Sequence, residues 1–179
     1  MATTAVMSGL QFDALPYEEG RRWELLEGDL IEVPSPTLRH RKIVFALQAA
    51  LNNHLRERKI EGIVSADVEF ALAADIRLRP DVCVLLPEKA GQLDEDRSPI
   101  PGAPDLAIEV ISPSERTTES QAKVWAYLRN GVAEVWQIYP RLRTIEIFKS
   151  ESHRTPGAHQ PLTTDLLPGF SAPLSSFLD

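Results

Sequence analysis

The sequence predicts an α/β protein in which a central mixed β-sheet is flanked by helices. Three patterns support this class: a long helical pattern over residues 39–58, strand-like runs between residues 62 and 112, and a second helical pattern followed by a hairpin over residues 112–150. Helices and strands mixed along a chain in this order pack in layers around one sheet. The length of 179 residues suits one domain, so we expect a flexible N-terminus over residues 1–11 and a single domain over residues 12–179.

The first part of the chain carries three predicted elements. Residues 13–22 are predicted to form a short helix capped by Asp13, and residues 23–33 a hairpin that turns at Gly28 and Asp29. Apolar residues then recur every four positions in the long helix. This spacing predicts one buried face, made of Ile43, Leu47, Leu51 and Leu55.

The second part of the chain predicts three strands, a helix and another hairpin. The strand-like runs are residues 62–72, 76–87 and 105–112, and the acidic, proline-rich segment between the last two is predicted to be a surface loop. Ser112 or Thr118 is expected to cap the following helix, because each has Glu or Gln three residues later, and Gly131 is expected to end it. Residues 133–140 and 143–150 predict a hairpin, and the last thirty residues predict mostly loop.

The composition excludes several classes of protein. No segment approaches the ~20 continuous apolar residues of a membrane span, and the first residues lack a signal-peptide pattern, so we expect a cytoplasmic protein that contacts no membrane. The one cysteine, Cys83, lies in an apolar run and is expected to be a core residue. A net charge of −7 opposes unspecific adhesion to nucleic acid, so any such contact would depend on the basic segments 39–42 and 56–59.

One carboxylate, Glu109, stands at the centre of the apolar run DLAIEVISP at residues 105–113. An ionised carboxylate is costly in an apolar interior unless it is paired, protonated or bound to a metal. Strand alternation places Asp81 with Arg77 and Arg79 on one face of the preceding strand. If the two strands are neighbours, Asp81 and Glu109 converge, and a divalent cation between them relieves their repulsion. Oxygen ligands without a Cys or His cluster suit Mg²⁺ or Mn²⁺ rather than Zn²⁺.

Structural explanations stay open for these residues. Asp81 could cap its strand or pair with Arg79, and Glu109 could pair with an arginine of the long helix. Lys123 is four residues from both Glu119 and Tyr127, a spacing typical of a solvated Glu–Lys pair. On such an exposed face, Lys123→Ala is expected to cost well under ~1 kcal/mol of stability.

Two further positions are candidates near the predicted hairpin and the long helix. Glu24 and Glu27 flank the hairpin turn, where Glu27 is either a water-mediated metal ligand or a solvated turn residue. His40 lies beside Arg39 at the start of the long helix, where a phosphate is favourably bound.

Several short motifs together resemble the Uma-type family of restriction-endonuclease-like proteins. They are PD at 80–81, EVISPS at 109–114, Lys123 with Tyr127, GVAEVWQIYP at 131–140 and WELLEGDLIEVPSPTLRH at 23–40. The resemblance covers roughly residues 12 to 178. It implies the nuclease core of the PD-(D/E)xK superfamily, in which Asp81 and Glu109 hold a divalent metal. The wider pattern has lysine where Ile111 stands, and the resemblance implies that this lysine has migrated to Lys123.

The leading hypothesis is therefore a metal-dependent DNA endonuclease that acts as a homodimer and uses Mg²⁺ or Mn²⁺. Its catalytic residues are Asp81, Glu109 and Lys123, and its metal ligands are Asp81, Glu109, the Val110 carbonyl and Glu27. Its candidate contacts to nucleic acid are Arg39, His40 and Arg79.

Two other hypotheses stay open. The first is a catalytically silent nuclease fold that serves as a binding or assembly module, which the net charge and Ile111 favour. The second is a dimeric structural protein anchored by Trp125 and Trp136.

Overall fold

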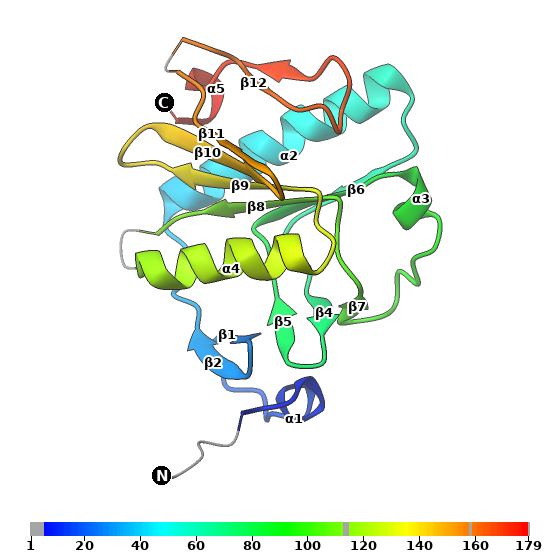
Figure 1. Ribbon diagram of the computed structural model, residues 1–179, viewed down its shortest axis with the longest axis vertical. Coiled ribbons are helices and arrows are strands. Elements are labelled where there is room, and N and C mark those ends of the chain that lie inside the picture. The colour runs from blue at the N-terminus through cyan, green and yellow to red at the C-terminus, as the bar shows by residue number, and fades with distance from the viewer. Residues whose placement is uncertain (1–5, 113–114, 158, 179) are drawn as a thin grey trace.

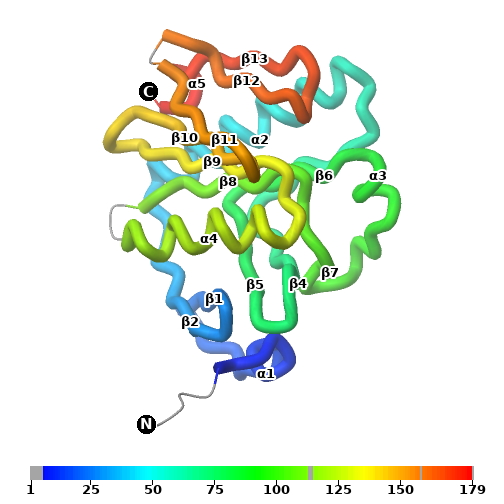
Figure 2. Tube along the Cα trace, viewed as in Figure 1, coloured from blue at the N-terminus to red at the C-terminus, as the bar shows by residue number. Residues whose placement is uncertain are grey.

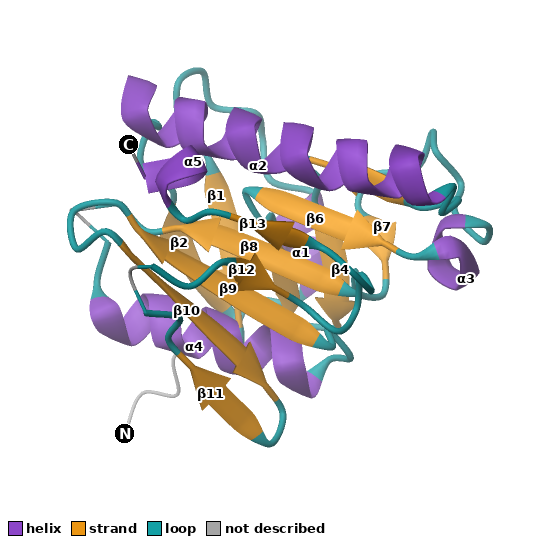
Figure 3. Ribbon diagram, turned by 90° about the horizontal axis from the view of Figure 1, so that it is seen from above, coloured by secondary structure: helices purple, strands orange, loops and turns teal. Residues whose placement is uncertain are grey.

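Two large β-sheets, one separate pair of strands and the helices that cover the sheets make up the described part of the fold (Figure 1). The computed structural model describes residues 6–112, 115–157 and 159–178. Helices α2 and α4 cover opposite faces of a central mixed sheet, so the predicted α/β class is confirmed (Figures 1 and 3). The short helix α1 and the C-terminal helix α5 lie at opposite ends of the molecule (Figure 2).

The central sheet has six strands in the order β11-β10-β9-β8-β6-β3. Strands β8 and β9 run parallel, whereas the other neighbours run antiparallel. The mixed sheet predicted from the sequence is thus present. Its strands are β3 (Ile63–Ser65), β6 (Val82–Leu85), β8 (Leu106–Val110), β9 (Glu134–Tyr139), β10 (Thr144–Lys149) and β11 (Ser152–Arg154).

The second sheet has the order β2-β1-β5-β4-β7 and lies below α4 in Figure 1. It contains the predicted N-terminal hairpin and part of the segment that follows the long helix. Its strands are β1 (Trp23–Leu26), β2 (Asp29–Glu32), β4 (Phe70–Ala73), β5 (Ile76–Leu78) and β7 (Ile100–Pro101); a separate pair is formed by β12 (Leu162–Thr163) and β13 (Ser171–Ala172).

Helix α2 (Leu38–Arg58) is the long helix that the sequence predicted. All four residues of its predicted apolar face are buried, and they pack with Leu106, Ile108 and Val110 of β8. The short helix α5 (Ser175–Leu178) adds Phe177 and Leu178 to this core. The face of β8 that carries Leu106, Ile108 and Val110 therefore packs against α2.

Helix α4 (Thr117–Arg129) covers the other face of the sheet, where Val124 and Tyr127 pack with Ala107 of β8. The buried Gln137 of β9 donates a hydrogen bond to the carbonyl of Ser120 at 2.8 Å, which fixes α4 on the sheet. Because side chains alternate along a strand, the side chain of Glu109 points to α4 as that of Ala107 does.

The strand predicted over residues 76–87 is broken at Pro80. Strand β5 ends at Leu78 in the second sheet, whereas β6 begins at Val82 in the central sheet. Proline has no N–H to donate to a ladder, so the chain changes sheets there. The expectation that Arg77 shares a face with Asp81 is therefore wrong: Arg77 binds Asp13 of the N-terminal segment at 2.9 Å.

The N-terminal helix also differs from the prediction. Helix α1 (Gly9–Asp13) precedes the predicted segment 13–22, because Ser8 and Gln11 form a capping box and Asp13 ends the helix instead of starting it. The helix begins within residues 1–11, whose flexibility stays a prediction.

Two turn assignments shift by a few residues. The β1–β2 turn is centred on Glu27 and Gly28, whose φ angles of +52° and +83° suit the turn that joins two twisted strands. Helix α4 begins after Arg116 without a side-chain cap, so the predicted caps at Ser112 and Thr118 are wrong. Gly131, with φ of +96°, follows the end of α4 as predicted.

The remaining expectations concern core residues and connecting segments. Cys83 and Trp136 are fully buried, whereas Trp125 is 54% exposed, so Trp136 is a core residue and not an interface anchor. The predicted surface loop before β8 contains the short helix α3 (Pro87–Ala90) and β7. No helix in the described part of the chain has the length and apolar character needed to cross a membrane.

Candidate active site

Asp81 and Glu109 lie at the ends of two neighbouring strands. Strands β6 and β8 are antiparallel, with Val82 opposite Ile108, so the next pair in the same register is Asp81 and Glu109. The N–H of Val110 donates a hydrogen bond to Asp81 Oδ2 at 2.7 Å, which holds the Asp81 carboxylate against β8. The structure thus brings together the two carboxylates that the sequence singled out.

The buried Glu109 carboxylate meets two side chains of α4. The Tyr127 hydroxyl donates a hydrogen bond to Oε1 at 2.7 Å, and Lys123 Nζ lies 4.0 Å from Oε2. Lys123 and Tyr127 are four residues apart and therefore face the same side of the helix. Glu109 is met by a lysine and a tyrosine, and no arginine of α2 pairs with it among the described residues.

Lys123 belongs to a buried ion cluster that also includes Glu24 of β1. Its Nζ lies 2.7 Å from Glu24 Oε2, and the other oxygen of Glu24 accepts a hydrogen bond from the Arg79 N–H at 2.9 Å. Only 7% of Lys123 and 3% of Glu24 are exposed. The expected solvated pair with Glu119 is therefore wrong; Glu119 pairs with Arg116 instead.

The electrostatics of the cluster favour a charged lysine and disfavour a charged Glu109. Burial raises the pKa of Glu109 well above its ordinary value; Lys123 opposes this shift, while Asp81, Glu24 and Glu115 reinforce it. Burial alone would lower the pKa of Lys123, but Glu109, Glu24 and Glu115 outweigh burial and raise it. Burial also raises the pKa of Tyr127, so its hydroxyl keeps the proton that it donates to Glu109. Negative charge in the cluster exceeds what one lysine can balance.

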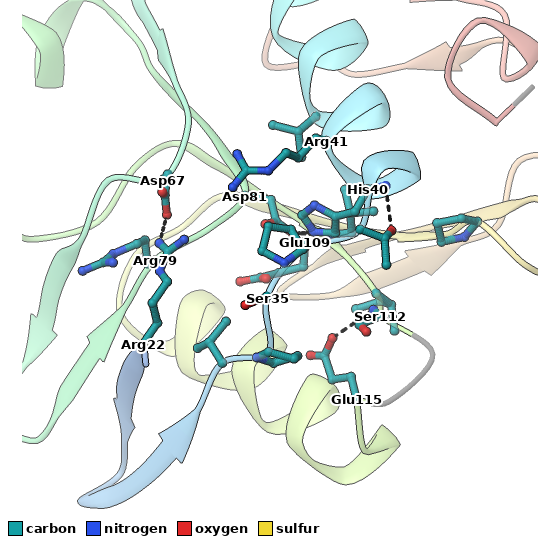
Figure 4. Close-up of a pocket in the computed structure, with 18 of the residues that line it drawn as sticks. Arg22, Ser35, His40, Arg41, Asp67, Arg79, Asp81, Glu109, Ser112 and Glu115 are labelled. Atoms are coloured by element: carbon teal, nitrogen blue, oxygen red, sulfur yellow. Dashed lines mark hydrogen bonds and ion pairs between the residues drawn. The ribbon is translucent and has the colours of Figure 1, made fainter. Parts of the chain in front are cut away.

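The acids of the cluster and Lys123 line a pocket of about 970 Å³, in which Figure 4 shows Asp81, Glu109 and Glu115. Helix α2 contributes His40, whose Nε2 lies 3.1 Å from Asp81 Oδ2. Arg79 also lines the pocket and pairs with Glu69 at 2.8 Å. The predicted nucleic-acid contacts Arg39, His40 and Arg79 are all among the residues that line this pocket, as is Val110.

Glu27 does not reach the pocket. It occupies the β1–β2 turn, where its side chain points outward and pairs with Arg129. Glu27 is not among the residues that line the pocket, and it lies apart from Asp81 and Glu109. Ile111 lines the pocket but carries no charge, which leaves Lys123 as the lysine of the cluster.

The donor set suits a hard divalent cation. No group of three or more His, Cys, Asp and Glu side chains in the described residues is arranged to hold a metal ion. Mg²⁺, however, is commonly held by one or two carboxylates, while water and substrate phosphate complete its coordination. Asp81 and Glu109 supply two such carboxylates, and the uncompensated negative charge around them fits a cation.

Sequence reasoning gave too little weight to Glu24 and missed Glu115. Glu24 stands between Trp23 and Leu25 in a strand of otherwise apolar residues, which is the same signal that identified Glu109. Glu115 lines the pocket, and one of its oxygens accepts a hydrogen bond from the Ser112 N–H at 3.3 Å. Burial raises its pKa.

The fold and the pocket together define an α/β protein of restriction-endonuclease-like architecture. The chain belongs to the Uma2 family, described as "Putative restriction endonuclease", whose pattern matches residues 10–175. A crystal structure titled as a putative nuclease belonging to DUF820, from Anabaena variabilis, shares the fold with a TM-score of 0.83 at 19% sequence identity. The match covers 96% of this chain and 97% of that chain. No curated protein matches the sequence. The predicted family and fold are confirmed.

Proposed function

We propose that the protein is a metal-dependent DNA endonuclease that hydrolyses phosphodiester bonds. The observation that carries this proposal is the buried cluster of Glu109, Lys123 and Glu24 beside Asp81, at the inner end of a pocket lined by arginines. Clusters of titratable groups with shifted pKa values in a pocket are typical of catalytic sites. The family description supports a nuclease.

Asp81, Glu109 and the carbonyl of Val110 are the proposed ligands of Mg²⁺ or Mn²⁺. The Val110 N–H faces Asp81, and the N–H and C=O of a residue in an extended strand point to the same side. Bound there, the ion would polarise the scissile phosphate and lower the pKa of a bound water.

Lys123 acts in this proposal as a fixed cation and hydrogen-bond donor. Its raised pKa keeps the ammonium group charged, so it cannot serve as a base. It would orient the attacking water and balance the charge that develops on the phosphate. Glu24 holds the ammonium group in place, while His40, Arg39 and Arg79 contact neighbouring phosphates. The attacking water adds to phosphorus and gives up one proton to solvent, the P–O3′ bond breaks, and the 3′ oxygen takes up a proton from solvent.

Asp81→Asn is expected to lower cleavage by at least about 10²-fold, because it removes one proposed metal ligand at constant volume. The assay follows supercoiled plasmid and circular single-stranded DNA with added Mg²⁺ or Mn²⁺. Glu27→Gln is the matched control, since it removes an exposed carboxylate outside the pocket and is expected to leave cleavage unchanged. Undiminished cleavage by Asp81→Asn, or no cleavage by the unaltered protein with either metal, would reject the proposal.

The alternative of a silent binding module is favoured by Ile111 and by the net charge of −7. A site that has lost its activity has no need to retain metal affinity. Calorimetric titration with Mn²⁺ distinguishes the two hypotheses. Mn²⁺ binding that disappears in Asp81→Asn supports the enzyme, whereas the absence of Mn²⁺ binding in the unaltered protein supports the binding module.

We expect a homodimer if duplex DNA is cut in both strands, because two active sites related by a two-fold axis face the two strands. The apolar hairpin β9–β10 no longer motivates this prediction, since Trp136, Ile138, Ile145 and Ile147 are buried in the core of their own chain. Light scattering should return about twice the chain mass of 20.0 kDa. A single chain mass, with nicked circles as the product, would contradict the dimer.

A further inference from the structure

The mouth of the active-site pocket carries two exposed apolar side chains, Phe45 and Leu142. Phe45 lies on α2 and is 73% exposed; Leu142 lies between β9 and β10 and is 72% exposed. Both line the pocket, whereas other exposed apolar side chains such as Leu10 and Trp125 do not. A solvent-exposed aromatic ring at the entrance of a charged pocket is suited to stack against a ligand that has a flat apolar surface.

Arginines surround the same entrance. Arg39, Arg41 and Arg141 line the pocket and are exposed, and none of them forms an ion pair within the described residues. Two of them belong to the first turns of α2, where the helix dipole disfavours positive charge. A bound anion such as phosphate would reduce this unfavourable interaction between the arginines and the helix dipole. Arg41 and Phe45 are four residues apart, so a guanidinium group and an aromatic ring share one face of α2.

The inner end of the pocket restricts the shape of the substrate. Glu109 is 6% and Lys123 7% exposed, so a scissile phosphate has to enter the pocket to reach them. The volume of about 970 Å³ lies at the upper end of the ~300–1,000 Å³ typical of pockets for drug-sized ligands. That space holds a few nucleotides of one strand. A duplex carries its phosphates on the outside of a wide paired helix, so a single strand reaches these buried groups more readily than a duplex does.

We propose that this pocket takes an unpaired strand of DNA, with phosphates on the arginines of the rim and a base stacked on Phe45. Arginine and aromatic side chains along one groove are the usual means of binding single strands without reading their sequence. The inference rests on the proposed nuclease function, because it names the substrate of that site. One strand requires one active site, so the inference does not depend on the predicted dimer.

Binding is measured by fluorescence anisotropy with a short labelled oligonucleotide, single-stranded or in a duplex, in the presence of EDTA so that cleavage does not interfere. The single strand should bind more tightly. Phe45→Ala should weaken its binding roughly 5- to 150-fold, the loss that removal of base–aromatic stacking produces. Trp125→Ala is the matched control, since it removes an exposed aromatic ring outside the pocket and should leave binding unchanged. Arg41→Gln should lower the slope of log K against log salt by about 0.7.

Equal or tighter binding of the duplex, tighter binding of an RNA strand of the same sequence, or unchanged binding by Phe45→Ala would overturn the inference. These outcomes differ from a failure of the proposed function. If the protein cleaves plasmid and shows no preference for the single-stranded circle, only the single-strand inference is contradicted. If it binds the single strand but cleaves neither circle, only the proposed nuclease activity is contradicted.

Discussion

Lys123→Met will lower the free energy of unfolding by about 3–5 kcal/mol and abolish cleavage. The substitution keeps the volume of the side chain but leaves the buried Glu24 and Glu109 without their cation. Removing one partner of a buried ion pair is costly because the remaining charge stays desolvated. This corrects the sequence-based expectation of a cost well under ~1 kcal/mol, which assumed an exposed lysine.

The measurement is a melting curve beside a plasmid cleavage assay. For a chain of this length the expected loss corresponds to a fall in Tm of about 6–20 °C. Lys42→Met, which removes an exposed lysine of α2, is the control and should change stability by less than about 0.5 kcal/mol. Lowering the pH should reduce the difference in Tm between Lys123→Met and the unaltered protein, because Glu24 and Glu109 then take up protons and no longer need a cation. If the variant melts and cleaves like the unaltered protein, Lys123 is neither the buried partner of these acids nor a catalytic residue.

Glu109→Gln will leave the melting temperature of the metal-free protein unchanged or raise it, and will remove most of its stabilisation by Mg²⁺ or Mn²⁺. Glutamine keeps an acceptor for the Tyr127 hydroxyl, and Lys123 keeps its contact with Glu24. The substitution also removes an acid whose charged form is disfavoured by burial and by the neighbouring Asp81 and Glu24. A ligand at ~100 times its Kd stabilises a protein by about 2.7 kcal/mol, so the loss of this effect is measurable.

The pH dependence of stability gives a second measure of the same substitution. The pKa of Glu109 is raised above its ordinary value of 4.5 in the folded protein, so the folded state holds this proton more tightly than the unfolded state. Stability from this group is therefore present at low pH and falls as the pH rises from 4.5 through the raised value. Glu109→Gln should remove that part of the fall, whereas Glu27→Gln should not. A large drop in melting temperature with an unchanged metal response would identify Glu109 as a structural residue.

The parts of the fold that the sequence predicted are those with a strong local pattern. Few other secondary structures fit the four-residue apolar repeat of α2 or the apolar run of β8, because each pattern matches an element with a completely buried face. Glu109 was identified for the same reason, since a carboxylate inside such a run is costly. Asp81 followed from its place just before the next apolar run, Val82 to Leu85.

The parts that the sequence did not predict depend on packing between distant segments. Pro80 signals a break, but only the assembled sheets show that the chain changes from one sheet to the other there. Lys123 has the spacing of a surface residue, and it is buried because Glu24, almost a hundred residues earlier, lies against α4. Glu27 and Glu24 are three positions apart in the same hairpin, yet one is exposed and the other buried.

The lysine of this site is carried by α4, whereas Glu24 and Glu109 are carried by strands of two different sheets. The position of the Lys123 ammonium group therefore depends on how α4 packs on the central sheet. The hydrogen bond from Gln137 of β9 to the Ser120 carbonyl of α4 is one contact that fixes this packing. A homologue can retain every motif residue and still be inactive, if substitutions under α4 shift the helix along the sheet. Under the proposed mechanism, in which Lys123 supplies the lysine, its absence at a position such as Ile111 does not by itself identify an inactive relative. The proposed mechanism therefore predicts that activity within the family depends on the docking of this helix as well as on the motif residues.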